Sequence, residues 1–279
     1  MEIKLENLKL NDWELNTTLS SEDIIGITGP EYEEVLEILS LKEIAEGQIM
    51  INEETITKEN QYEYYKKNSL VQKDLKKINY LNTIKEHMDF IINYYHLQIK
   101  NIEKKEKDSL KIVGLDSSLL DRNITSLSKS EQKKVQIAIS LLSNPEIMIL
   151  DEPFKSLDNK SRKKIMMILT KLKEQYHKII IIGSNNADIL YQYTTKMLFV
   201  KNKRIFLEGS TQELYERVDY LKRNGYKIPE IVLFTYKVIK KKKVKLEYHK
   251  DIRDIIKDIY KHVWEEKKYG NIQFNNNDC

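Results

Sequence analysis

Two adjacent carboxylates, Asp151 and Glu152, are the residues of this 279-residue chain best suited to chemistry. They follow four apolar residues, Ile147 to Leu150, which is typical of a buried parallel strand that brings acids to the C-terminal edge of a sheet. One acid at such an edge can hold Mg²⁺ through water, and its neighbour can polarise a water molecule for attack on a phosphate. Taken alone, the string fits a core strand with a polar turn at Pro153 better, so the interpretation depends on the rest of the chain.

Two further stretches have residue types that suit phosphate chemistry. Gly29 and Pro30 form a turn after a β-branched run, which is where a phosphate-binding loop begins. Ser128 is followed three residues later by Glu131, a spacing typical of a capping box at the start of a helix. We therefore expect the place of a phosphate-binding loop after Gly29 and the start of a helix at Ser128.

The composition limits the classes of function. With 41% hydrophobic and 32% charged residues and a net charge of +4, the chain is typical of a soluble protein and too weakly basic to indicate nucleic-acid binding. No apolar run approaches about 18 residues and no secretory segment precedes the first strand, so we expect a cytosolic chain. The only cysteine is Cys279, which excludes a disulfide framework and a cysteine-based zinc site. The histidines lack metal-ligand spacing: His87, His96, His177, His249 and His262.

The elements that must position these residues alternate between strands and helices. This alternation predicts an α/β fold with a right-handed, mostly parallel, doubly wound sheet. An amphipathic helix is predicted from Ser161 to Gln175. The predicted strands are 24–28, 48–51, 147–150 and 178–183, with a hairpin formed by 197–200 and 204–207.

Two parts of the chain have a helical period instead. Residues of about 75–145 indicate an inserted helical subdomain. From about Thr211 the pattern is helical again, with breaks at Gly225 and Pro229. We therefore expect a first domain over 1–215 and a small C-terminal domain over 216–279 with a frayed tail.

Read in order, these motifs resemble the ATP-binding cassette of ABC transporters. The resemblance covers about residues 1–215 and implies a P-loop NTPase (RecA-like) core with an inserted helical subdomain and a small C-terminal extension. Residues 221–231 are also similar to the appended domain of energy-coupling-factor (ECF) transporter ATPases, which drive the uptake of vitamins and metal ions. The motifs that carry the resemblance are Gly29-Pro30, Gln72, 127–131, 151–158 and 181–186.

The resemblance implies a role for each candidate residue. Asp151 would hold the Mg²⁺ shell and Glu152 would polarise the attacking water. Gln72 would sense the γ-phosphate and link it to a groove for a membrane subunit's coupling helix; otherwise it is a polar loop residue. Ser128 would offer its hydroxyl and nearby backbone amides to ATP held by the opposite subunit; otherwise it is a plain N-cap. Asp158 would support the dimer interface.

The sequence departs from the family at the phosphate loop. The family reads Gly-x-x-x-x-Gly-Lys-Ser/Thr, in which amides cradle phosphate, the lysine neutralises it and the hydroxyl binds Mg²⁺. After Gly29-Pro30 the chain reads Glu31 to Leu36, with no lysine, serine, threonine or further glycine. Acids suit a helix N-terminus but repel a bound polyanion. We therefore expect this chain's own nucleotide site to be empty. The adenine-stacking residue stays open between Trp13 and Tyr32.

Two more positions depart from the family. Asn185 follows Ser184 where the family has its switch histidine, and an amide can hydrogen-bond but cannot take up a proton. Lys129 and Ser130 replace the two glycines of the signature, so a Cβ intrudes where the backbone approaches phosphate. Lys129 could instead offer its charge to the partner's γ-phosphate. The signature is thus predicted to be damaged but still usable.

These departures favour the degenerate member of a heterodimer. Its partners would be an intact ABC ATPase subunit and a polytopic membrane subunit, at the cytoplasmic face of the membrane. ATP and Mg²⁺ would occupy a composite site with the partner. Whether this chain is itself an enzyme stays open, and we expect it to be inactive alone. One alternative is a competent transport ATPase. A more distant one is nucleic-acid or anionic-membrane binding through Lys240–Lys243 and Lys245, although no nucleic-acid partner is expected.

Overall fold

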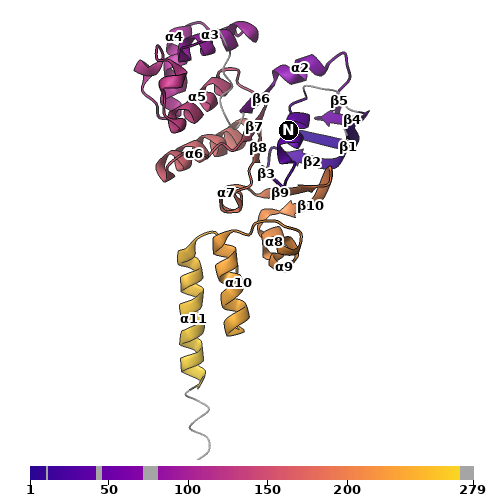
Figure 1. Cartoon of the computed structure of the whole chain (residues 1–279), viewed down its shortest axis with the longest axis vertical. Coiled ribbons are helices and arrows are strands. Elements are labelled where there is room, and N and C mark those ends of the chain that lie inside the picture. Colours follow the sequence, from indigo (N-terminus) through magenta and orange to yellow (C-terminus); the bar gives the residue numbers. More distant parts are fainter. Residues whose placement is uncertain (11, 42–45, 72–80, 271–279) are drawn as a thin grey trace, which may run out of the picture. The chain divides into compact units, whose positions relative to one another are not determined.

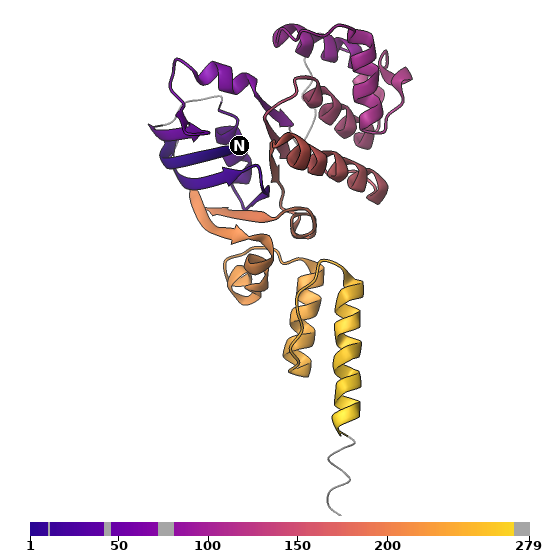
Figure 2. The same ribbon diagram turned by 180° about the vertical axis from the view of Figure 1, so that it is seen from behind.

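The computed structural model describes residues 1–10, 12–41, 46–71 and 81–270. The chain divides into two compact units, which are described separately (Figures 1 and 2). The first unit comprises Met1–Asn185 and Tyr193–Glu208, and the second comprises Asn186–Gln192 and the chain from Gly209 onwards. No helix of the described residues is long and apolar enough to cross a membrane.

The first unit is built on a sheet whose strand order is β5-β4-β1-β2-β10-β9-β3-β8-β7-β6. Several neighbouring strands in the sheet are far apart in the sequence, such as β3 and β8, so crossover connections join them. The bounds are β1 (Glu2–Leu10), β2 (Trp13–Ser20), β3 (Ile24–Thr28), β4 (Glu46–Ile51), β5 (Glu54–Thr55), β6 (Asn68–Val71), β7 (Ile147–Asp151), β8 (Ile179–Gly183), β9 (Lys196–Lys201) and β10 (Arg204–Ser210).

The half of the sheet that carries the site is parallel. Strand β3 lies between β8 and β9, and β8 pairs with β7, all in parallel register. Every residue of β3, β7 and β8 is buried, as expected for isoleucine-rich strands covered on both faces. The predicted buried strand before Asp151 is therefore confirmed.

The other half makes the sheet mixed. Strand β1 pairs antiparallel with β2 and β4, and β4 pairs antiparallel with β5. Side chains in β1 and β2 alternate between buried and exposed, as expected for strands with one covered face. Strand β10 joins this part to the rest through a parallel pairing with β2. The predicted α/β fold is confirmed, with an antiparallel part added to the parallel strands.

The helices of the first unit are α1 (Tyr32–Leu39), α2 (Gln61–Lys66), α3 (Ile84–Tyr94), α4 (Ile102–Ile112), α5 (Lys129–Leu142) and α6 (Asn159–Tyr176). Helices α3, α4 and α5 pack together as a group (Figure 1). Two of them begin with a complete capping box, formed by Thr83 with Glu86 and by Ser128 with Glu131. These boxes fix where α3 and α5 begin, because each satisfies amides that a helix start leaves without partners.

The second unit is helical, with α7 (Ala187–Tyr193, of which the last residue belongs to the first unit), α8 (Thr211–Glu216), α9 (Val218–Arg223), α10 (Glu230–Lys242) and α11 (Ile252–Gly270). Tyr191 and Tyr215 pack edge to face, with ring centroids 5.7 Å apart. Helix α9 ends before Gly225, which has φ of +86°, and α10 begins directly after Pro229. The predicted helix breaks at these two residues are confirmed. The tail that was expected to be frayed, 271–279, lies outside the described residues.

Candidate functional site

The site lies where β3, β7 and β8 end. Asp151 pairs with Gly183 in the ladder between β7 and β8, and Ile27 pairs with Gly183 in the ladder between β3 and β8. This register brings together the residues that follow each strand. Gly29, Asp151, Glu152 and Asn185 therefore meet at one edge of the sheet, as their positions after parallel strands predict.

The connection from β3 to α1 is very short. Only Gly29, Pro30 and Glu31 separate the end of β3 at Thr28 from the start of α1 at Tyr32. Gly29 has φ of +135°, and a Cβ atom there would lie 2.0 Å from the backbone oxygen of Val200. Glycine is therefore required here by the approach of β9, independently of any phosphate.

Asp151 is bound by a tyrosine from the start of α1. The Tyr32 hydroxyl donates a hydrogen bond to Asp151 Oδ1 at 2.8 Å, and both side chains are buried. Burial raises the pKa of Tyr32, and the bond to Asp151 raises it further, so the phenol keeps its proton. Lys133 on α5 donates from Nζ to the backbone oxygen of Asp151 at 3.3 Å. The acid predicted to hold the Mg²⁺ shell is thus in contact with side chains from two helices.

Glu152 is held against the end of β8. Its Oε2 accepts a hydrogen bond from Ser184 Oγ at 2.9 Å, and its Oε1 accepts one from the Asn185 amide at 3.1 Å. The backbone of Glu152 is left-handed, with φ of +46°, which turns the chain sharply after the strand. The carboxylate of Glu152 is therefore fixed by two donors from the residues that follow β8.

Asn185, which stands where a switch histidine was expected, joins this edge to the Gly29 turn. Its Oδ1 accepts hydrogen bonds from Thr28 Oγ1 at 3.1 Å and from the Gly29 amide at 3.2 Å. The backbone amide of Asn185 donates to Glu152, so Asn185 connects the ends of β3, β7 and β8. The Asn185 side chain is a neutral amide, so it accepts these hydrogen bonds but cannot become protonated as a histidine could.

One of the acids after Gly29, Glu34, pairs with a lysine that the sequence did not indicate. Lys203 Nζ lies 2.5 Å from Glu34 Oε2, and the Lys203 backbone amide donates to Glu31 Oε2 at 3.0 Å. Trp13 Nε1 donates to the same oxygen of Glu34 at 2.9 Å. The hydrogen bonds from Lys203 and Trp13 lower the pKa of Glu34. Trp13 and Tyr32 are 1% and 2% exposed, so neither ring presents a face for stacking an adenine in this arrangement.

At the start of α5, Ser128 acts as an N-cap. Its Oγ accepts from the Glu131 amide at 3.3 Å, and Glu131 Oε2 accepts from the Ser128 amide at 2.8 Å. The capping box predicted from the spacing of Ser128 and Glu131 is therefore confirmed. Ser128 and Lys129 are exposed and Ser130 is half-buried, so the first turn of α5 is open to solvent.

Asp158 also caps a helix. Its Oδ1 accepts a hydrogen bond from the Ser161 amide at 2.7 Å, which places the start of α6 at Asn159. The predicted helix from Ser161 therefore begins two residues earlier. Asp158 is exposed, which is compatible with the interface role implied by the resemblance but does not test it. Gln72, the other predicted nucleotide-sensing residue, lies outside the described residues.

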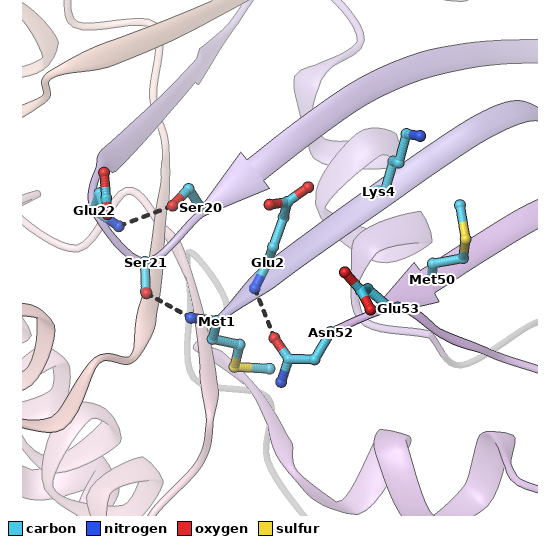
Figure 3. A pocket seen from close by; sticks show the side chains of 9 residues that line it. All are labelled: Met1, Glu2, Lys4, Ser20, Ser21, Glu22, Met50, Asn52 and Glu53. Carbon is cyan, nitrogen blue, oxygen red and sulfur yellow. Dashed lines mark hydrogen bonds between the residues drawn. The ribbon is translucent and has the colours of Figure 1, made fainter.

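A pocket lies apart from this edge, where the end of β2 meets the start of β1 and the end of β4 (Figure 3). Its volume is about 590 Å³. The Met1 amino group donates to Ser21 Oγ at 2.9 Å, and the Glu2 amide donates to Asn52 Oδ1 at 2.9 Å (Figure 3). None of the candidate site residues discussed above lines it. The lining residues are Met1, Glu2, Lys4, Ser20, Ser21, Glu22, Met50, Asn52 and Glu53.

Comparison with known proteins found a family model that matches part of the chain. Residues 34–155 match the family model described as ABC transporter. This stretch, 122 of the 279 residues, is therefore similar to the ATP-binding domain of ABC transporters. The matched segment includes Asp151 and Glu152 and begins just after the Gly29 turn.

Curated relatives of this ABC transporter domain come from energy-coupling-factor systems. The energy-coupling factor transporter ATP-binding protein EcfA2 of Enterococcus faecalis is 27% identical over 223 residues, which is 78% of this chain and 77% of the relative. The EcfA2 protein of Bacillus licheniformis is 28% identical over 223 residues, covering 76% of this chain and 75% of the relative. The chain is thus homologous to ECF transporter ATP-binding subunits.

Solved structures agree on the fold. The cbiO1 protein of Clostridium perfringens, described as part of the ABC transporter complex cbiONQ, aligns with a TM-score of 0.67 at 21% identity, over 84% of this chain and 98% of the other. The bacterial ABC transporter cassette MJ0796, solved as a dimer, aligns with a TM-score of 0.64 at 20% identity, over 75% and 98%. The predicted P-loop NTPase cassette fold is confirmed. Proteins of this family bind ATP with Mg²⁺.

Proposed function

We propose that this chain is an ATP-binding-cassette subunit of an ECF-type importer for vitamins or metal ions, and that it is the degenerate member of a heterodimer. It couples ATP hydrolysis at a site held mainly by its partner to transport. The homology to ECF subunits supports the class of transporter. The observation that carries the degenerate role is the short turn from Gly29 to Tyr32, together with the bond from Tyr32 to Asp151.

The residues at this chain's own edge do not fit Mg²⁺ and ATP. A phosphate loop needs several consecutive amides that point at one anion and a lysine after them, but only three residues connect β3 to α1. The position directly before α1 is Glu31, and Glu33 and Glu34 lie in its first turn. An acid next to a bound triphosphate is repulsive by several kcal/mol at about 4 Å near a protein surface. We therefore assign no hydrolytic step to this edge.

The start of α5 is the part proposed to serve the partner. Ser128 and Lys129 are exposed there, and the amides of a helix's first turn favour an anion. In the proposed heterodimer they face the γ-phosphate of ATP that is held by the intact subunit, with Ser130 and Asp158 near the same interface. The Ser128 hydroxyl is already used within its capping box, so the contribution of Lys129 carries more of the interaction.

The other partner is a polytopic membrane subunit, and the complex lies at the cytoplasmic face of the membrane. Gln72 is proposed to link the nucleotide to the surface that receives this subunit. Asp151 and Glu152 keep the family's residue types but not its chemistry in this chain. The Lys240–Lys243 run is proposed to serve the helix itself, because it forms the last turn and C-cap of α10, where cations are favoured, and Lys240 lies 3.6 Å from Asp219.

Nucleotide titration of the isolated full chain tests the empty site. We expect no Mg-ATP binding at micromolar nucleotide, measured by calorimetry. Micromolar binding that is abolished by Asp151→Ala would show that the edge holds nucleotide, and the proposal would then be wrong.

A second experiment tests the contribution in trans, using the co-purified complex. Ser128→Ala removes the N-cap of α5, and Thr83→Ala removes the matching N-cap of α3. The two changes should cost similar stability, because both break a capping box. We expect Ser128→Ala together with Lys129→Ala to lower ATPase activity about tenfold, and Thr83→Ala to leave it within about twofold. An equal loss of activity from the paired change and from Thr83→Ala would indicate that Ser128 and Lys129 have a purely structural role.

A further inference from the structure

Tyr32, at the start of α1, donates a hydrogen bond to the buried Asp151 at the end of β7. We propose that the Tyr32 side chain is an internal ligand, which ties the start of α1 to the end of β7 and holds the edge of the sheet in one arrangement without nucleotide. This inference rests on the proposed function, because it explains how the edge is kept ordered when no nucleotide binds there.

The ring of Tyr32 is fixed by the backbone of β8. A Cβ atom placed on Gly183 would lie 2.8 Å from Cδ2 and from Cε2 of Tyr32 and 2.5 Å from Leu36 Cδ1. Helix α1 therefore lies directly on the glycine at the end of β8, and no atom fits between them. The absence of a side chain at Gly183 is what allows the tyrosine ring to reach Asp151.

The hydroxyl of Tyr32 satisfies a buried acid. Asp151 is 8% exposed, and a carboxylate at this depth requires hydrogen bonds or a cation. The phenol supplies a donor at 2.8 Å. A tyrosine hydroxyl carries its proton at neutral pH, so it can donate this hydrogen bond to the carboxylate. A neutral donor from the chain thus takes the stabilising role that a metal ion's water shell has beside such an acid.

The polar groups around Tyr32 are engaged in the same way. Ser184 and the Asn185 amide bind the Glu152 carboxylate, and Asn185 Oδ1 binds the Gly29 amide and the Thr28 hydroxyl. Nucleotide would have to break the bond between Tyr32 and Asp151 and then reopen this network. Hydrogen bonds within the chain therefore occupy the polar groups that nucleotide would need at this edge.

A double-mutant cycle on the full chain tests this coupling. Tyr32→Phe keeps the ring and removes only the hydroxyl, and it should lower the folded-to-unfolded equilibrium constant about tenfold or more, measured by urea unfolding of the first unit. In an Asp151→Leu background the same change should have less than about a twofold effect, because the acceptor is gone. If Asp151→Leu does not fold, Asp151→Asn replaces it, and the effect of Tyr32→Phe should then fall to about threefold.

Tyr64→Phe is the matched control. The Tyr64 hydroxyl also binds a carboxylate in the same unit, Glu54, at 2.5 Å, but this hydrogen bond is exposed to solvent. We expect less than about a threefold change in the folded-to-unfolded equilibrium constant for this control. An equal effect of Tyr32→Phe in the presence and absence of Asp151 would overturn the inference, since the tyrosine would then only fill space.

Thermal unfolding with and without Mg-ATP separates this inference from the proposed function. The wild-type melting temperature should not change with Mg-ATP, because a ligand stabilises only a protein that binds it. A rise in the wild-type melting temperature would contradict the empty site, whatever the cycle shows. An absent coupling with an unchanged melting temperature would contradict the internal ligand alone.

Discussion

Asn185 Oδ1 accepts a hydrogen bond from the Gly29 amide at 3.2 Å, so the residue after β8 holds the turn after β3. In this position the amide side chain acts as a fixed acceptor for the backbone. Thr28 Oγ1 donates to the same oxygen at 3.1 Å. The turn is thus stabilised by protein contacts at the point where a phosphate loop would need its amides free.

The first prediction concerns the Gly29 turn. Gly29→Ala should destabilise the first unit by about 3 kcal/mol or more, because the new Cβ would lie 2.0 Å from the Val200 backbone oxygen at a φ that favours glycine. Urea unfolding of the full chain measures this change. Gly114→Ala is the control: its φ is +79°, but its nearest atom, at 3.0 Å, is the flexible end of Lys164. We expect about 1 kcal/mol there. Similar costs at both positions would mean that the close approach of β9 is not the cause.

The second prediction concerns a buried acid in the helical group. Burial, and then the charge of Asp89, raises the pKa of Glu106 on α4 to about 7; Glu103 raises it further, while Lys85 opposes them. The folded state therefore binds the proton more tightly than the unfolded state, so stability should fall as the pH rises from about 4.5 through 7. Glu106→Gln should stabilise the chain at pH 8 by on the order of 2 kcal/mol and have little effect at pH 4.5.

Unfolding free energies at several pH values measure the Glu106 effect. Glu103→Gln is the control on the same helix, because Glu103 is exposed and its pKa is lowered by Lys107. Because Glu103 is the smallest of the contributors that raise the pKa of Glu106, this change should give much less stabilisation at pH 8 than Glu106→Gln. If Glu106→Gln left the pH dependence of stability unchanged, Glu106 would not titrate in this range.

The third prediction concerns the start of α6. Asp158→Ala should lower the melting temperature of the first unit by about 2–4 °C, because it removes the acceptor for the Ser161 amide. Asp158→Asn keeps a side-chain oxygen and should melt close to the wild type. The hydrogen bond from Ser161 lowers the pKa of Asp158, so this stabilisation is present above its ordinary pKa and is lost as the pH falls through the lowered value. A melting temperature equally low for both variants would point to the charge instead of the cap.

The fourth prediction distinguishes the degenerate subunit from a competent transport ATPase. In the co-purified complex, Glu152→Gln in this chain should change the ATPase rate by less than about twofold, because its carboxylate is held by Ser184 and Asn185 and no phosphate loop faces it. The matching change in the intact partner should lower the rate at least about a hundredfold. A large loss from the change in this chain would favour the competent ATPase.

The parts of the fold that follow from local patterns could be predicted from sequence. The strand that ends at Asp151 is a continuous apolar run, which predicts a strand covered on both faces of a parallel sheet, and the structure shows it fully buried. The spacing of Ser128 and Glu131 indicated the capping box at α5, because that motif is complete within four residues. Gly225 and Pro229 were predicted to break the helical pattern, and α9 ends before the first while α10 begins after the second.

The contacts that decide the chemistry could not be predicted in this way. Tyr32 and Asp151 are 119 residues apart, and Lys203 and Glu34 are 169 residues apart. Their meeting depends on the order of β9, β3, β8 and β7 in the sheet, which no local pattern contains. The sequence indicated that acids follow Gly29, but not that a lysine in the turn between β9 and β10 neutralises Glu34. Asn185 was recognised as a replacement for histidine, while its structural role required the geometry.

The brief connection between β3 and α1 limits how this protein can evolve. The connection is too short for a phosphate-binding loop, because only Gly29, Pro30 and Glu31 lie between the end of β3 and the start of α1. Exchanging one amino acid for another, even Tyr32 for lysine, cannot lengthen the backbone. Regaining a phosphate loop would therefore require an in-frame insertion between β3 and α1 together with loss of the bond between Tyr32 and Asp151.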